Sequence, residues 1–265
     1  MSLFQAVVLG IVQGLTEFLP VSSSGHLVLA NYYFGWGHLP FYAEIATNTG
    51  TLLAVLVALR KDVRLAASGF AGLTSAGARQ GEGWWLAILV ILGSIPTAII
   101  GLALKDFIEA RLLAPFPVCI ALIATGFILW FSPTSGKKTD TRELRKRDAV
   151  IGGITQGLAV IPGISRSGTT IATMMWRGTA AELAARFSFL MYLVVSVGVT
   201  LIGIVDIRES GIEAIPLIGM ILASFLTGYA AILLLFSLLR RGQFKWFAPY
   251  LWVVAGITLA RLFLT

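Results

Sequence analysis

Two short stretches of this chain place ionisable and hydroxyl side chains among apolar residues. In the first, Gln13 and Glu17 lie four residues apart, so both project from one face of a helix. A serine run and a histidine follow, namely Ser22, Ser23, Ser24 and His26. Inside a membrane a carboxylate costs roughly 2.5 to 3.5 kcal/mol, so we expect Glu17 to face a cavity or a partner. A histidine beside a serine run and a nearby carboxylate could act as base, acid or nucleophile, so Glu17, Ser23 and His26 are the candidate catalytic residues.

The second stretch, residues 163 to 170, has the residue types of an anion cradle. Arg166 presents a flat fork of donors that suits phosphate or carboxylate oxygens. Around it stand glycines, hydroxyl residues and the start of a short helix: Gly163, Ser165, Ser167, Gly168, Thr169 and Thr170. The two glycines have the spacing of a nucleotide P-loop, but no lysine follows and no α/β pattern surrounds them. These two differences exclude ATP binding.

Each of these side chains also has a purely structural interpretation. Glu17 and Arg166 can form an ion pair that has no further role. His26 can bond the turn before it, and the serines can form a turn and cap the next helix. The other histidine, His38, lies in a Gly/Trp-rich loop and is expected to have no chemical role.

The two stretches belong to an internal repeat. Residues 6 to 26 recur without a gap 143 residues later as residues 149 to 169, and ten of the 21 aligned positions are identical. The differences are chemical: Glu17 faces Val160, Ser23 faces Arg166, and His26 faces Thr169. One half supplies an acid and a histidine and the other an arginine, which is the pattern expected of a site shared between two repeats.

The composition is that of an integral membrane protein, with 57% hydrophobic and 12% charged residues. Six stretches are long enough to cross a bilayer: about 45 to 60, 84 to 104, 115 to 132, 184 to 205, 214 to 239 and 246 to 264. The N-terminus lacks the features of a cleaved signal peptide. The single cysteine, Cys119, excludes an intramolecular disulfide.

The net charge of +7 reports topology rather than a nucleic-acid partner. If the six spans alternate, 15 of the 20 Lys and Arg residues lie in loops on one side. The positive-inside rule makes that side cytoplasmic. Both termini are then expected outside the cell, and loop 133–148 is expected to be a basic cytoplasmic connection.

Four further apolar pieces are too short to span: about 4 to 20, 26 to 36, 148 to 161 and 168 to 176. They form two pairs, each around a Ser/Gly-rich turn that breaks the helix. The sequence therefore predicts an all-α polytopic membrane protein with two re-entrant helical hairpins. Three spans separate the copies, so repeat one (about 1–132) and repeat two (about 143–265) have inverted topology within a single domain (1–265). Their hairpin tips are expected to meet near the middle of the membrane.

The segment Gln13-Gly-Leu-Thr-Glu17-Phe-Leu-Pro-Val-Ser-Ser-Ser-Gly-His26, together with Pro162-Gly-Ile-Ser-Arg-Ser-Gly-Thr-Thr170, resembles the undecaprenyl-diphosphate phosphatase family, also called the bacitracin resistance family. The resemblance covers essentially the whole chain. It implies a cell-membrane hydrolase that removes the terminal phosphate of a polyprenyl diphosphate to regenerate the lipid carrier of cell-wall synthesis.

The resemblance also implies roles for individual residues. It assigns an acidic pair to Gln13 and Glu17, a catalytic serine-histidine element to Ser23 and His26, and phosphate binding to Ser165, Arg166 and Thr170. It further implies a divalent cation, Mg²⁺ or Ca²⁺, for which Glu17 is the natural ligand. Membrane lipids are expected partners, nucleic acid is not, and a homodimer stays open. The site is expected to open to the outer face.

Two departures from the family pattern stand out. Gln13 removes one acidic ligand, and Asn48, an expected substrate contact, stands where many members have glutamine. Two chemical schemes stay open, attack by Ser23 with His26 as base, or attack or water activation by His26. A rival function is an inverted-repeat transporter or flippase for an anionic lipid or small anion.

Overall fold

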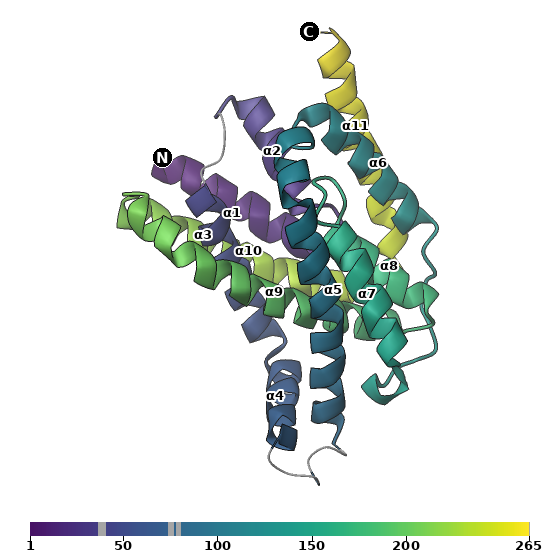
Figure 1. The fold of residues 1–265 in the computed structure, drawn as a ribbon. Helices are drawn as coiled ribbons and strands as arrows, with labels where there is room; N and C mark the ends of the chain where they lie inside the picture. The colour runs from purple at the N-terminus through teal and green to yellow at the C-terminus, as the bar shows by residue number, and fades with distance from the viewer. Residues whose placement is uncertain (37–40, 74–76, 78–80, 265) are drawn as a thin grey trace.

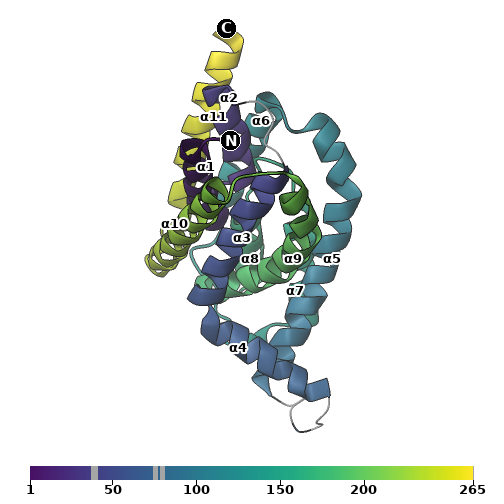
Figure 2. The same cartoon turned by 90° about the vertical axis from the view of Figure 1, so that its left-hand side faces the viewer.

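The computed structural model describes residues 1–36, 41–73, 77 and 81–264, and this part of the chain is helical with no β-strand. Figures 1 and 2 show long helices crossing at several angles around a central region where short helices end. The α-helices are α1 (Leu3–Phe18), α2 (Ser23–Phe34), α3 (Phe41–Ala58), α4 (Arg60–Gly69), α5 (Glu82–Arg111), α6 (Pro115–Trp130), α7 (Lys146–Leu158), α8 (Arg166–Trp176), α9 (Ala181–Glu209), α10 (Ala214–Arg240) and α11 (Phe247–Leu264).

Five segments of the described chain are long and apolar enough to cross a membrane: α3, α5, the 181–203 part of α9, α10, and Phe244–Leu264, which contains α11. The predicted sixth span forms α6, but this helix has only 16 residues. At 1.5 Å per residue it is about 24 Å long, shorter than a bilayer core of about 30 Å. Pro115 and Pro117 lie in its first turn, where a helix accepts proline, and the helix ends at Trp130, about two residues before the predicted end.

The four short helices form two hairpins, as the sequence predicts. In the first hairpin α1 and α2 are joined by residues 19–22, and in the second α7 and α8 are joined by residues 159–165. The turns are built alike. Ser22 Oγ accepts from the Gly25 N–H and Ser165 Oγ accepts from the Gly168 N–H, so each serine caps the helix that follows.

The two repeats pack crosswise, because the first helix of each hairpin lies against a long helix of the other repeat. Helix α1 packs on α10, and α7 packs on α5. Glycines permit this approach. A Cβ added at Gly10 would lie 2.5 Å from the Met220 carbonyl oxygen, and one added at Gly153, its repeat partner, would lie 2.0 Å from the Gly93 carbonyl oxygen.

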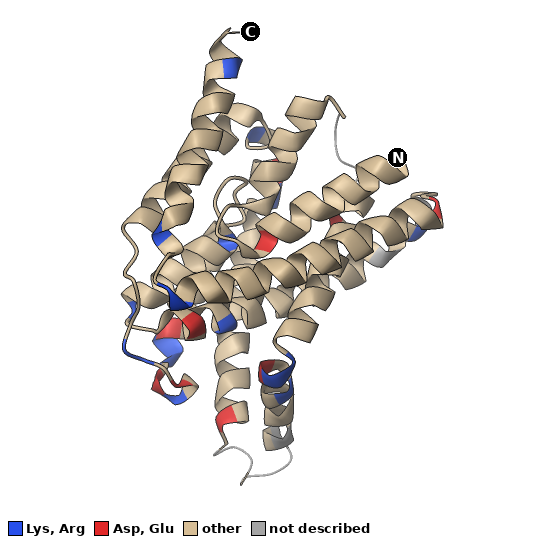
Figure 3. Cartoon of the chain, turned by 180° about the vertical axis from the view of Figure 1, so that it is seen from behind, with Lys and Arg blue, Asp and Glu red and all other residues tan. Residues whose placement is uncertain are grey.

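Basic residues gather at the end of the molecule formed by α4 and the connection between α6 and α7 (Figure 3). There the fully buried carboxylate of Asp148, at the start of α7, binds Lys138 Nζ at 2.7 Å and Arg177 Nη2 at 2.8 Å. Burial alone would raise the pKa of Asp148. The hydrogen bonds from Lys138, the Arg145 N–H and Arg177 outweigh burial and hold that pKa below its usual value. This cluster ties the connection between the repeats to the base of the second hairpin.

Candidate active site

The tips of the two hairpins contact each other in the middle of the fold, as expected from the repeat. A Cβ added at Gly25 would lie 3.0 Å from Gly163 Cα, and one added at Gly168 would lie 3.1 Å from Pro20 Cβ. Gly25 and Gly168 are equivalent positions of the repeat, so the two contacts are related by its pseudo-symmetry. Hydrogen bonds also cross in both directions. The Gly163 N–H donates to Ser22 Oγ at 3.0 Å, and Ser167 Oγ donates to the Leu19 carbonyl at 3.3 Å.

A cavity of about 170 Å³ lies between the tips. The polar side of its lining is supplied by both hairpins and the apolar side by the second hairpin. The lining residues are Glu17, Ser22, Ser23, Ser24, Ala159, Val160, Ile164, Ser165 and Arg166. The repeat mismatch of Glu17 with Val160 therefore places an acid on one wall of the cavity and an apolar side chain on another.

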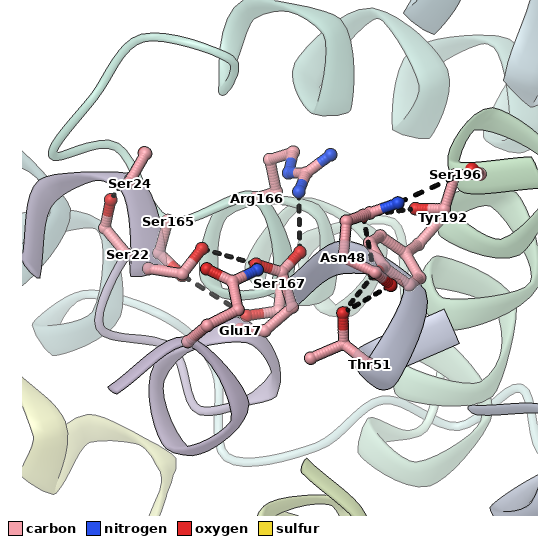
Figure 4. Close-up of polar contacts among 12 residues, drawn as sticks. Glu17, Ser22, Ser24, Asn48, Thr51, Ser165, Arg166, Ser167, Tyr192 and Ser196 are labelled. Atoms are coloured by element: carbon pink, nitrogen blue, oxygen red, sulfur yellow. Dashed lines mark hydrogen bonds and ion pairs between the residues drawn. The ribbon is translucent and has the colours of Figure 1, made fainter. Parts of the chain in front are cut away.

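The carboxylate of Glu17 is the centre of the polar network. Its Oε1 accepts a 2.6 Å hydrogen bond from Arg166 Nη2, and its Oε2 accepts one of 2.8 Å from Gln13 Nε2. Ser23 Oγ also donates to Oε2. The Glu17 side chain is only 3% exposed, so three donors, one of them cationic, compensate its burial. Figure 4 shows Arg166 reaching Glu17 from the opposite hairpin.

Two helices begin at this cavity. Ser23 is the first residue of α2, and Arg166 is the first residue of α8. The first-turn N–H groups of an α-helix have no partner within the helix, and the helix dipole favours negative charge at this end. Two converging N-termini and one guanidinium make the cavity suited to an anion with several oxygens.

The glycines and threonines of the predicted cradle serve the second tip itself. Gly163 has a φ of 97°, a conformation that favours glycine, and its carbonyl accepts from Thr125 Oγ1 at 2.8 Å. Thr170 is fully buried, and its hydroxyl donates to Gln156 Oε1 on α7 at 3.4 Å. The Thr169 hydroxyl is buried and has no hydrogen-bond partner among the described residues. Neither threonine is among the residues that line the cavity, and the Thr170 hydroxyl is directed to α7 instead.

His26 also lies outside the cavity lining. Its Nδ1 is 2.9 Å from the Ser22 carbonyl oxygen, and its Nε2 is 2.8 Å from the hydroxyl of Tyr250 on α11. Because a carbonyl only accepts, Nδ1 carries the proton of the neutral ring, and Nε2 accepts from Tyr250. The two rings stack with centroids 5.7 Å apart. His26 thus joins the first tip to α11, whereas Ser23 has Glu17 as its partner. His38 lies outside the described residues.

Asn48, a predicted substrate contact, joins α3 to α9 instead. Its Oδ1 accepts from the hydroxyls of Tyr192 at 3.0 Å and Ser196 at 3.1 Å, and its Nδ2 donates to Thr200 Oγ1 at 3.1 Å. Sequence reasoning missed Tyr192, whose ring lies 5.3 Å from the guanidinium carbon of Arg166. A signal was present, because residues 192, 196 and 200 carry hydroxyls at helical spacing on one face of an apolar span.

The donor set fits a divalent cation only together with a phosphate ligand. Among the described residues that line the cavity, Glu17 supplies the single carboxylate, and both of its oxygens already accept hydrogen bonds. The described part of the chain has no group of three His, Cys, Asp or Glu side chains that could hold a metal. Mg²⁺ typically uses one or two carboxylates plus substrate phosphates, which matches a single acid beside an anion cavity.

Comparison with known proteins gives a consistent result. The family model described as "Bacitracin resistance protein BacA" matches residues 6–257. The chain is 66% identical to the "Undecaprenyl-diphosphatase" of Acaryochloris marina over 99% of both chains. Proteins of the same name from Desulfosudis oleivorans and Carboxydothermus hydrogenoformans are 42% and 38% identical over at least 96% of each chain. The chain therefore belongs to the bacitracin resistance protein BacA family.

Proposed function

We propose that this protein is an integral membrane undecaprenyl-diphosphate phosphatase, which converts the lipid diphosphate to the monophosphate carrier used in cell-wall synthesis. The family membership and the relatives' names support this activity. One structural observation carries the assignment of residues. The Glu17 carboxylate binds Ser23 Oγ and the Arg166 guanidinium at once, at the point where both hairpin tips meet.

The diphosphate would lie in the cavity with its terminal phosphate near Arg166 and the N-termini of α2 and α8. Phosphoryl transfer needs charge neutralisation above all, and these three groups supply positive potential from the protein itself. Ser22, Ser24 and Ser165 add hydroxyl donors around the same space. The first isoprene units would contact the apolar wall of Ala159, Val160 and Ile164.

Ser23 is the proposed nucleophile and Glu17 its base. Ser23 Oγ attacks the terminal phosphorus while its proton moves to Glu17 Oε2, and the bond from phosphorus to the bridging oxygen breaks. The lipid monophosphate leaves with that oxygen. Water then attacks the phosphoserine, Ser23 Oγ leaves and recovers the proton from Glu17, and inorganic phosphate departs with the hydrogens of the water.

His26 has a supporting role in this scheme. Its contacts with the Ser22 carbonyl and the Tyr250 hydroxyl hold the start of α2, which carries Ser23, against α11. This scheme keeps Ser23 as the nucleophile but differs from both schemes that the sequence left open, because Ser23 Oγ is hydrogen-bonded to Glu17, whereas the ring nitrogens of His26 bond the Ser22 carbonyl and the Tyr250 hydroxyl.

A divalent cation, Mg²⁺ or Ca²⁺, is proposed to bind with the substrate, held by Glu17 and the diphosphate oxygens. When bound, it would neutralise phosphate charge. The protein is a multi-pass membrane protein, and we propose that both termini lie outside the cell with the cavity open to the outer face, because the Lys and Arg residues concentrate at the opposite side. A homodimer stays a prediction that light scattering of the solubilised protein would check.

Phosphate release by detergent-solubilised protein tests the proposal and its rival together. An enzyme hydrolyses polyprenyl diphosphate in micelles, where no membrane remains to be crossed. A transporter or flippase releases no phosphate there. We expect release, and we expect a metal chelator to reduce it. Absence of release with pure, folded protein, both with and without added Mg²⁺ or Ca²⁺, would contradict the proposed function.

A further inference from the structure

We infer that Tyr192 is a positioning residue for the reaction: its ring fixes the plane of the Arg166 guanidinium and leaves the guanidinium N–H groups free for phosphate. The inference rests on the proposed function, since it concerns how Arg166 binds the diphosphate. Tyr192 lies within the apolar part of α9 and carries no sequence motif, yet its ring centroid is 5.3 Å from Arg166 Cζ.

The mode of contact carries the argument. A guanidinium has five N–H donors, all in its plane. A hydrogen-bond acceptor placed beside it would orient the group but would occupy one or two of those donors. An aromatic face instead binds the cation through its ring quadrupole and does not use its donors. Arg166 has one described side-chain hydrogen bond, from Nη2 to Glu17, so its other donors remain available to phosphate oxygens.

The ring itself is held rigidly. The Tyr192 hydroxyl donates to Asn48 Oδ1 at 3.0 Å and lies 2.8 Å from Thr51 Oγ1, both on α3. On another side the ring packs edge-on against Phe18, with centroids 5.7 Å apart and an interplanar angle of 84°. Phe18 is the neighbour of Glu17 in α1. Tyr192 therefore contacts Arg166 directly and Glu17 through the next residue, so it supports both members of the ion pair.

This arrangement gives Asn48 a role other than substrate contact. Its amide links the Tyr192 hydroxyl to α9 residues Ser196 and Thr200, as Figure 4 shows in part. The amide thus anchors the ring from α3 and keeps α3 and α9 in register beside the cavity. Binding of phosphate would draw Arg166 partly away from Glu17, and the ring contact is then the one that keeps the guanidinium plane in place.

The test compares Tyr192→Leu, Tyr192→Phe and a matched control, Phe189→Leu. Phe189 is a buried aromatic residue on the same helix that also packs on Phe18, at 5.2 Å, and makes no described contact with Arg166. Initial rates with polyprenyl diphosphate give kcat and KM for each solubilised variant. Inhibition by inorganic pyrophosphate reports anion binding alone, and thermal unfolding reports the shared effect of a smaller buried side chain.

We expect Tyr192→Leu to lower kcat/KM and to weaken pyrophosphate inhibition by roughly 5- to 30-fold, the range of a partly desolvated cation–π contact. Tyr192→Phe loses the hydroxyl anchor to Asn48 but keeps the ring and its edge-on contact with Phe18, so its loss should be smaller and stay within about threefold of the unmodified protein. Phe189→Leu should lower the unfolding temperature as Tyr192→Leu does while leaving pyrophosphate inhibition unchanged.

Two outcomes would overturn the inference. Equal weakening of pyrophosphate inhibition in Tyr192→Leu and Phe189→Leu would show a general packing effect. A loss in Tyr192→Phe as large as in Tyr192→Leu would show that the hydroxyl, not the ring, matters. Either outcome is distinct from failure of the proposed function, in which the unmodified protein itself releases no phosphate.

Discussion

Replacing Arg166 with alanine should separate the stability of the site from its chemistry. The substitution leaves the Glu17 carboxylate, 3% exposed, with Gln13 and Ser23 as neutral donors but no cation. Breaking a buried ion pair by removing one partner costs about 3 to 5 kcal/mol. Because the Arg166 side chain is 32% exposed, we expect the lower end, about 3 kcal/mol. For a chain of this size that is a fall of roughly 6 to 12 °C in Tm.

The second change, Glu17→Gln in the same chain, removes the unpaired charge. The amide keeps a hydrogen-bonding group beside Gln13 and Ser23, so the double variant should recover most of the lost stability. Hydrolysis should not recover in either variant. Loss of an arginine that stabilises a phosphoryl transition state costs about 10³-fold or more, and the double variant also lacks the base.

Thermal unfolding followed by fluorescence of the seven tryptophans, beside phosphate release in the same detergent, measures both effects. Lys105→Ala is the matched control. It removes a cation from a 3.9 Å pair with Glu109 in which both side chains are 58% exposed, and it should change neither quantity. Unfolding of Arg166→Ala at the temperature of the unmodified protein, or a double variant no more stable than Arg166→Ala, would contradict a buried ion pair that stabilises the site.

Three further predictions concern the elements that hold the site. Gly25→Ala places a methyl group 3.0 Å from the backbone of Gly163, so it should separate the tips and lower kcat at least about tenfold. Gly256→Ala is the control and should leave kcat unchanged, because no atom lies within 4 Å of the added Cβ. Asp148→Asn should lower the unfolding free energy by about 3 kcal/mol. Because the pKa of Asp148 is lowered in the folded state, the contribution of its carboxylate to stability is present at neutral pH and is lost as the pH falls below about 4. The difference in Tm between Asp148→Asn and the unmodified protein should therefore shrink below that pH. His26→Ala should reduce phosphate release but keep a measurable rate, because Ser23 and Glu17 remain hydrogen-bonded. Complete inactivity of the folded variant would instead make His26 a catalytic residue.

Features encoded locally were predictable from the sequence. The two hairpins follow from turn residues and serine caps within a few positions of each other, and the repeat predicted that their tips meet. The repeat mismatches also located the polar network, because Glu17, Ser23 and Arg166 do meet in one cavity. The start of α6 at Pro115 was predicted, but its end was placed about two residues too late, at 132 instead of Trp130.

Features that depend on the path of the chain were not predictable. His26 bonds Tyr250, 224 residues away, and Tyr192 bonds Asn48, 144 residues away, so no local spacing connects them. Thr170 carried the expected chemistry for phosphate binding, but the packing of α8 on α7 turns its hydroxyl to Gln156. A motif therefore indicated which segments meet, and tertiary packing decided which of their side chains face the cavity.

The most direct test of the account is the rate of phosphate release from polyprenyl diphosphate by solubilised Ser23→Ala protein. Ser68→Ala on α4 is the control and should match the unmodified protein, because Ser68 is exposed and its described hydrogen bond is to the Leu65 carbonyl of the same helix. We expect Ser23→Ala to be slower by at least about a thousandfold while its Tm changes little, since it loses the nucleophile and a single hydrogen bond. A rate within tenfold of the unmodified protein would contradict the assignment of Ser23 as nucleophile and of Glu17 as its base.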